Sequence, residues 1–140
     1  MDTDAEFFRE LMGMFKMESQ EQLQSICQGL KYLDDYPDGE ERNERMETIF
    51  RAAHSLKGAA RTVGVVDIET IGQTLEHFFS VVKQQETQIS EQTRVHLDNI
   101  LNHLGGLIES IDEAGKVTGD KSEAMRLMDE LNDRIAELKS

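Results

Sequence analysis

The sequence predicts an all-α protein, an antiparallel up-down four-helix bundle with an additional C-terminal helix. The chain has one proline in 140 residues, and its long segments rich in Glu, Gln, Leu, Met and Lys favour helices because these side chains lose little rotamer freedom there. Apolar residues recur every three or four positions, which is the spacing of one helical face. Turn signals divide the chain into five such segments, and short connections between them favour antiparallel neighbours.

The first two helices are expected at about residues 4–35 and 40–62. A capping-box pattern from Thr3 to Glu6 opens the first helix, whose apolar stripe runs from Phe8 to Leu33. The Pro37-Asp38-Gly39 segment predicts the turn that separates the two helices. The second helix has the most regular apolar seam of the chain, at Met46, Ile49, Ala53, Leu56, Ala60 and Val63.

Three further helices are expected after an irregular link at residues 63–67. Apolar positions run from Ile68 to Val82 in the third and from Leu97 to Ile111 in the fourth, with a polar break at residues 88–90 between them. A glycine-bounded loop at residues 115–120 precedes the fifth helix, at about residues 121–138, which begins with a capping pattern from Asp120 to Glu123. We therefore expect a bundle over residues 1–116, and an accessory helix or the start of an interdomain linker over residues 117–140.

Charge and composition exclude several classes of function. Fifteen Lys and Arg against 28 Asp and Glu give a net charge of -13, which repels nucleic-acid phosphates and anionic membranes. No apolar stretch approaches the roughly 20 residues of a membrane span, and no export leader is evident. The single cysteine, Cys27, cannot form an internal disulfide, which is typical of a reducing compartment. We expect a cytoplasmic protein with no nucleic-acid and no membrane partner.

A cationic strip in the second helix is the unusual feature of this acidic chain. Residues 48–66 contain no Asp or Glu. At 100° per residue, His54 falls one step outside the apolar seam, on the same side as Lys57. Gly58 follows, although glycine inside a helix costs up to about 1 kcal/mol relative to alanine, so another surface is expected to approach this face. The basic residues of the strip are Arg51, Lys57 and Arg61.

The third helix has a matching polar flank at Glu69, Gln73 and Glu76. A neutral imidazole has one nucleophilic nitrogen, and a histidine in water is largely neutral at pH 7. If Glu76, or a water that it orders, accepts the Nδ1 proton of His54, the lone pair is fixed on Nε2, which points to solvent. Lys57 is close enough along the helix to neutralise part of a phosphoryl charge. The strip therefore offers an acceptor and a cation, but no metal cradle and no nucleotide loop.

The segment around His54 reads Arg51-Ala52-Ala53-His54-Ser55-Leu56-Lys57-Gly58. It resembles histidine phosphotransfer (HPt) domains, most closely the phosphotransfer domain at the front of CheA-type chemotaxis histidine kinases. The resemblance continues through residues 59–64 and the Leu75-Glu76 pair, includes the acidic pattern of residues 15–23, and covers about residues 5–112. It implies that His54 is the phosphoacceptor, with Lys57 and Gly58 as its usual companions, and that Glu76 holds the imidazole. Many chemotaxis kinases have a second histidine where this chain has Gln73.

The resemblance also implies partners. His54 would accept a phosphoryl group from a histidine kinase catalytic domain or a receiver aspartate, and pass it to an aspartate of a response-regulator receiver domain. The chain would need no cofactor and would be no enzyme by itself, because the partner brings the Mg²⁺ and the ATP site. We expect it to be a module of a larger CheA-type or hybrid kinase. The residues expected to contact the partner are Arg51, Ser55, Gly58, Arg61 and Gln73.

Two other functions remain open from the sequence. The first is the dimerisation and phosphoacceptor region of an ordinary sensor kinase. Such regions resemble one another in having an acidic residue directly after the histidine, and Ser55 at that position disfavours this function. A non-catalytic helical protein-interaction bundle would give His54 no chemistry. A di-metal bundle is disfavoured, because none of the four histidines follows a glutamate by three positions, so no metal site is expected.

Overall fold

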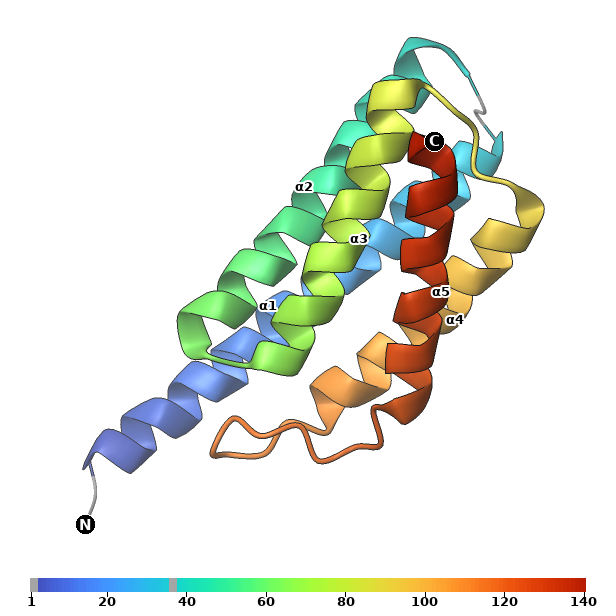
Figure 1. The fold of residues 1–140 in the computed structure, drawn as a ribbon. Helices are drawn as coiled ribbons and strands as arrows, with labels where there is room; N and C mark the ends of the chain where they lie inside the picture. The colour runs from blue at the N-terminus through green and yellow to red at the C-terminus, as the bar shows by residue number, and fades with distance from the viewer. Residues whose placement is uncertain (1–2, 36–37) are drawn as a thin grey trace.

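The computed structural model describes residues 3–35 and 38–140, and within these ranges the fold is helical (Figure 1). The predicted fold class, a helical bundle followed by a further C-terminal helix, is confirmed. Outside the helices, the described residues contain an isolated antiparallel β-bridge between Ile111 and Val117. The helices are α1 (Thr3–Asp35), α2 (Gly39–Val63), α3 (Val66–Gln85), α4 (Glu91–Glu109) and α5 (Ser122–Lys139).

The last helix belongs to the packed structure. Figure 1 shows α5 beside α3 and α4, and α5 makes more contacts with each of them than α3 and α4 make with one another. The expectation that sequential helices are the main neighbours therefore holds for α1, α2 and α3, but not for α3 and α4. The boundary expected after residue 116 stays a prediction. The face of α5 turned inward consists of Ala124, Leu127, Met128, Leu131 and Ile135, all buried.

The apolar seam of α2 forms the centre of the core. Five of its six predicted positions are fully buried, and the sixth, Val63 at the helix end, is half-buried. Removing such side chains from water supplies most of the stability of a helix pair, at roughly 25 cal/mol for each Å² of apolar surface. Because the seam fixes how α2 is turned, it also fixes which residues of α2 lie just outside the core.

Some predicted helix ends are wrong. Thr3 is already helical, so it is not the cap that the sequence suggested. Asp120 accepts a hydrogen bond from the Ser122 backbone amide at 2.9 Å, but Glu123 pairs with Arg126 instead of reaching back in a capping box. Of the predicted turn, Asp38 precedes α2 and Gly39 begins it, whereas Pro37 lies outside the described residues.

The link between α2 and α3 is shorter than expected. Gly64 adopts a left-handed backbone conformation (φ +80°), and the amides of Gly64 and Val65 bond to the carbonyls of Arg61 and Ala60. This pair of backbone hydrogen bonds is typical of a helix C-terminus. The third helix therefore begins at Val66, directly after the cap, and the tight turn keeps α2 and α3 side by side.

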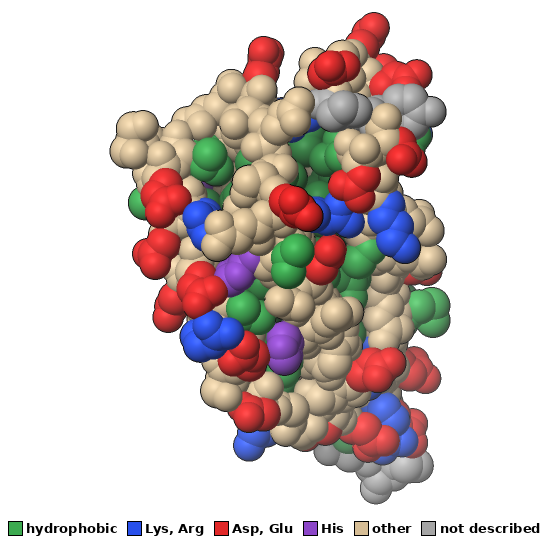
Figure 2. Space-filling view, turned by 90° about the vertical axis from the view of Figure 1, so that its right-hand side faces the viewer, with side chains coloured by type: hydrophobic (Ala, Val, Ile, Leu, Met, Phe, Trp, Pro, Cys, Tyr) green, Lys and Arg blue, Asp and Glu red, His purple; other side chains and the backbone are tan. Residues whose placement is uncertain are grey.

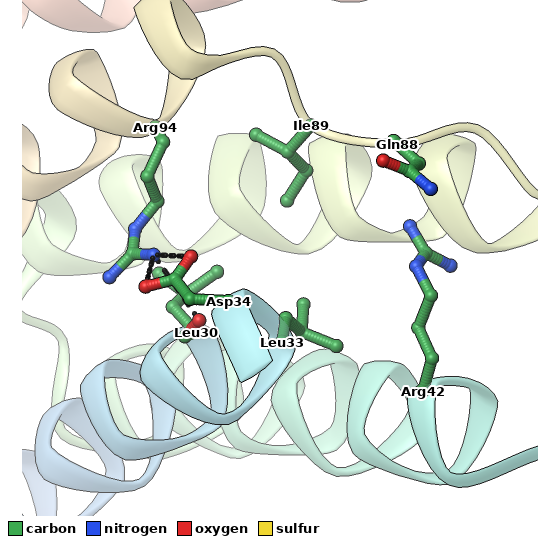
Figure 3. Close-up of a pocket in the computed structure, with 7 residues that line it drawn as sticks. All are labelled: Leu30, Leu33, Asp34, Arg42, Gln88, Ile89 and Arg94. Carbon is green, nitrogen blue, oxygen red and sulfur yellow. Dashed lines mark hydrogen bonds and ion pairs between the residues drawn. The ribbon is translucent and has the colours of Figure 1, made fainter. Parts of the chain in front are cut away.

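Two arginines form hydrogen bonds between neighbouring segments at the end of the bundle far from His54. Arg94 of α4 donates to both carboxylate oxygens of Asp34, at 2.7 and 2.8 Å, and to the Leu30 carbonyl at 3.2 Å (Figure 3). Arg42 of α2 donates to the Thr87 carbonyl at 2.5 Å. Arg42 and Arg94 both line a small pocket at this end. Arg42 lies about 18 Å from His54 along α2, at 1.5 Å per residue, so the pocket is not part of the candidate site.

The surface has the acidic character that the net charge predicts. Figure 2 shows acidic side chains spread over the side of the molecule that faces right in Figure 1. Across residues 3–35 and 38–140, none of the helices has the length and apolar character needed to cross a membrane.

Candidate functional site

His54 stands on the outer edge of α2, immediately beside the core. Its chain neighbour Ala53 is fully buried, whereas the His54 side chain is 64% exposed. One turn earlier on α2, the ring of Phe50 stacks against the imidazole, with centroids 6.4 Å apart and ring planes at 19°. The helix therefore presents the imidazole to solvent while Phe50 supports one side of the ring.

Glu76 reaches across from α3 and binds two groups of α2. Its Oε2 forms a hydrogen bond with Nδ1 of His54, and its Oε1 accepts one from Nζ of Lys57 at 2.8 Å. The Lys57 and Glu76 side chains are each 17% exposed, so this contact is largely shielded from water. The structure thus brings together the three residues to which the sequence assigned chemistry.

The contact with Glu76 determines the tautomer of a neutral His54. An ionised carboxylate can only accept hydrogen bonds, so Nδ1 must be the nitrogen that bears the proton. The remaining lone pair then lies on Nε2, on the opposite edge of the ring. A nucleophilic nitrogen in this position is directed away from Glu76.

The ionisation of Glu76 depends on both partners. Partial burial favours the protonated acid, but the hydrogen bonds from Lys57 and His54 outweigh burial and hold the pKa of Glu76 below its usual value. Glu76 is therefore a carboxylate at neutral pH. As an anion it can orient the imidazole and stabilise positive charge on it.

The other cations of the strip are also paired. Arg51 binds Glu47 of its own helix at 3.0 Å, and Arg61 binds Glu69 of α3 at 2.9 Å. The local positive charge expected from residues 48–66 is therefore largely balanced by carboxylates that lie outside that segment. Lys57 is likewise engaged by Glu76, so the predicted stabilisation of a phosphoryl charge by Lys57 stays a prediction.

A groove beside His54 extends the site onto α1. It has a volume of about 430 Å³ and includes Ser55, Gly58, Ala59 and Thr62 of α2. No α1 residue was expected at a partner surface from the sequence, although residues 15–23 carry the acidic pattern of the HPt resemblance. The α1 residues of the groove are Glu18, Ser19 and Gln22.

The residues predicted to meet a partner lie on two helices around His54. Arg51, Ser55 and Arg61 are exposed on α2, and Gln73 is exposed on α3. Gly58 is half-buried, yet a Cβ atom placed on it would meet nothing within 4 Å. Since this chain does not fill the space above Gly58, the surface that the glycine was expected to admit would have to come from a partner.

Metal binding has no candidate in the part of the chain that the structure describes. No group of three or more His, Cys, Asp or Glu side chains is arranged there to hold an ion. The free Cys27 is half-buried, and burial raises the pKa of its thiol, an effect to which Asp98 adds. A raised pKa lowers the reactivity of a thiol, so Cys27 adds nothing to the site.

The exposed His54 imidazole on a helical bundle, held at Nδ1 by a carboxylate, has the arrangement expected of a histidine phosphotransfer domain. The model of the Hpt domain matches residues 10–114. The chain belongs to the Hpt domain family.

Its relatives include much longer proteins. The chemotaxis protein CheA of Bacillus subtilis is 28% identical over 120 residues, which are 86% of this chain and 17% of that protein. CheA of Halobacterium salinarum is 28% identical over 111 residues, 79% of this chain and 16% of the relative. The chain thus spans about one sixth of the length of the curated relatives that it matches.

A solved structure supports the fold. It is the phosphorylated P1 domain of CheA3 in complex with CheY6 from R. sphaeroides, which matches with a TM-score of 0.78 and 21% sequence identity. The match covers 93% of this chain and 98% of that chain. At this identity the likeness establishes the all-α fold alone.

Proposed function

We propose that this chain is a phosphocarrier of two-component signalling in which Nε2 of His54 accepts and donates the phosphoryl group. One observation supports this proposal above the others. The Glu76 carboxylate holds Nδ1 of a largely exposed His54, which leaves Nε2 as the nucleophilic nitrogen on the solvent side. A bundle that served only protein interaction would not need this arrangement.

The transfer step follows from the tautomer. The Nε2 lone pair attacks phosphorus, an N–P bond forms, and the bond from phosphorus to the leaving oxygen breaks, with both of its electrons going to that oxygen. The proton on Nδ1 remains, so the phosphorylated ring bears positive charge next to Glu76. The carboxylate stabilises this charge as it develops, and donation to an aspartate reverses the same changes.

The partners provide everything else that the transfer requires. In this proposal a histidine kinase catalytic domain binds ATP and donates to His54, and a response-regulator receiver domain accepts the group on an aspartate. Mg²⁺ is bound by the partner, and phosphoryl transfer depends mainly on such positioning and charge stabilisation. The receiver would contact the exposed surface around Ser55 and Gly58 and the groove that α1 shares with α2. The chain would act as a module of a larger CheA-type or hybrid kinase.

The test is transfer of label to His54. The isolated chain is incubated with a CheA catalytic region and radiolabelled ATP, or with a labelled receiver domain, and should acquire an acid-labile, alkali-stable label. His54→Gln should remove the label. His77→Gln is the matched control, because His77 is exposed on α3 and should be dispensable. Label that persists in His54→Gln, or a wild-type chain that neither donor labels, would refute the proposal.

A further inference from the structure

Glu76 can bind both His54 and Lys57 only if α3 lies very close to α2 at this level. A glutamate has a short side chain, and here its two oxygens reach two residues of the neighbouring helix. The spacing between the two backbones therefore determines whether both contacts form at once. A residue that sets this spacing would influence the imidazole without touching it.

Gly72 lies one helical turn before Glu76 on the same face of α3, and it is buried against α2. A Cβ atom placed on Gly72 would lie 3.1 Å from both the Cα and the backbone nitrogen of Lys57, and 3.3 Å from the Lys57 Cβ. These distances are shorter than ordinary van der Waals contacts. Any larger residue at position 72 would have to push the two helices apart.

This contact differs from those of the other glycines. A Cβ atom at Gly29, Gly105, Gly115 or Gly119 would approach atoms of side chains. At Gly72 the nearest atoms belong to the backbone of α2, which can yield only if the whole helix moves. Gly72 has no left-handed backbone angle, and glycine inside a helix is unfavourable. Close approach of the helices is therefore the physical reason for a glycine here.

We propose that Gly72 is a positioning residue that sets the α2–α3 spacing at Lys57, so that the Glu76 carboxylate can hold His54 Nδ1 and Lys57 Nζ together. The proposal rests on the proposed function of His54 for its effect on transfer. Its effect on the imidazole is independent of that function. From the sequence, another surface was expected to approach the face of Gly58, which is open in the structure, and Gly72 had no assigned role.

The test is Gly72→Ala, the smallest change that adds a Cβ atom. Separation of the helices by a few tenths of an ångström should weaken both Glu76 contacts and reduce the rate of His54 labelling by roughly three- to tenfold, given that a 1 Å misplacement can cost about 10²-fold. The ¹⁵N resonances of the His54 ring should shift in the same direction as in Glu76→Gln. Gly106→Ala is the matched control, because a Cβ atom there meets nothing within 4 Å, and it should change neither readout.

A double-mutant cycle separates positioning from general damage to the fold. If Gly72 acts through Glu76, Gly72→Ala should have little further effect in a Glu76→Gln background, because contacting residues are not additive. Additive losses, loss of helical circular dichroism in Gly72→Ala, or unchanged His54 resonances would each overturn the positioning role. If neither donor labels the wild-type chain, the proposed function fails, while the resonances of Gly72→Ala still decide this inference.

Discussion

Substituting Glu76 by glutamine tests how the site controls its histidine. Gln preserves the shape of the side chain but removes the negative charge, so both hydrogen bonds from α2 lose their charged acceptor. A hydrogen bond to a charged group contributes about 1.5–3 kcal/mol. Because the His54 side chain is 64% exposed, water screens the interaction, and the lower end of that range applies. About 1.5 kcal/mol corresponds to roughly a tenfold slower reaction.

The assay is the initial rate of His54 labelling by a kinase catalytic region in excess, at saturating ATP. Circular dichroism and a thermal melt accompany it, since Glu76→Gln should leave the helices intact. Glu69→Gln serves as the matched control, because Glu69 is on the same helix but binds Arg61. An unchanged rate in Glu76→Gln, or an equal loss in Glu69→Gln, would refute the reasoning that the carboxylate acts on the imidazole.

Three further predictions follow from the same contacts. Leu75→Ala should reduce the free energy of unfolding by about 2–5 kcal/mol, measured by urea denaturation, because Leu75 is fully buried; a loss below 1 kcal/mol would contradict its place in the core. Lys57→Ala should slow labelling by about fivefold, as expected for one lost hydrogen bond of about 1 kcal/mol. A larger effect than that of Glu76→Gln would contradict the inference that Lys57 acts on His54 through Glu76. The lowered pKa of Glu76 means that its ionised form contributes stability above the carboxyl's unfolded pKa of about 4.3 and loses that contribution as the pH falls through the lower folded pKa. The stability difference between wild type and Glu76→Gln should therefore stay constant from about pH 7 to 5 and fall as the pH drops below about 4.3; a difference that does not change below that pH would show that the pKa is not lowered.

The helices could be predicted from the sequence because apolar spacing reports one face of each helix directly. Which helices pack against one another could not be predicted in this way, since all five have an apolar face and the spacing of apolar residues does not say which two faces meet. The position of α5 between α3 and α4 is such a case. One signal was available, because Phe78, Phe79, Val81 and Val82 are too close together to fit one narrow stripe, and all four are buried. A helix with so wide an apolar arc needs neighbours on several sides.

In the candidate site, too, some contacts could be predicted from the sequence and others could not. The angle of 100° per residue places His54 and Glu76 on matching flanks of their helices, whereas the contact between them was implied by the resemblance to HPt domains. The pairing of Arg51 with Glu47 could also have been read from their i, i+4 spacing. The pairing of Arg61 with Glu69 and the tight contact at Gly72 depend on the distance between helices, which no local pattern encodes.

The contacts around Glu76 also bear on how Lys57 would act. The ammonium of Lys57 is bound to Glu76, whereas a phosphoryl group on Nε2 would extend from the opposite edge of the His54 ring. In the proposed mechanism Lys57 would therefore act on the ring through Glu76, by fixing the orientation of the carboxylate. Gly72 acts one step further away, by keeping the two helices close enough for both contacts. Substitutions at Glu76, Lys57 and Gly72 should consequently alter one property, the hydrogen bond at His54 Nδ1, and shift the ¹⁵N resonances of that ring in the same direction.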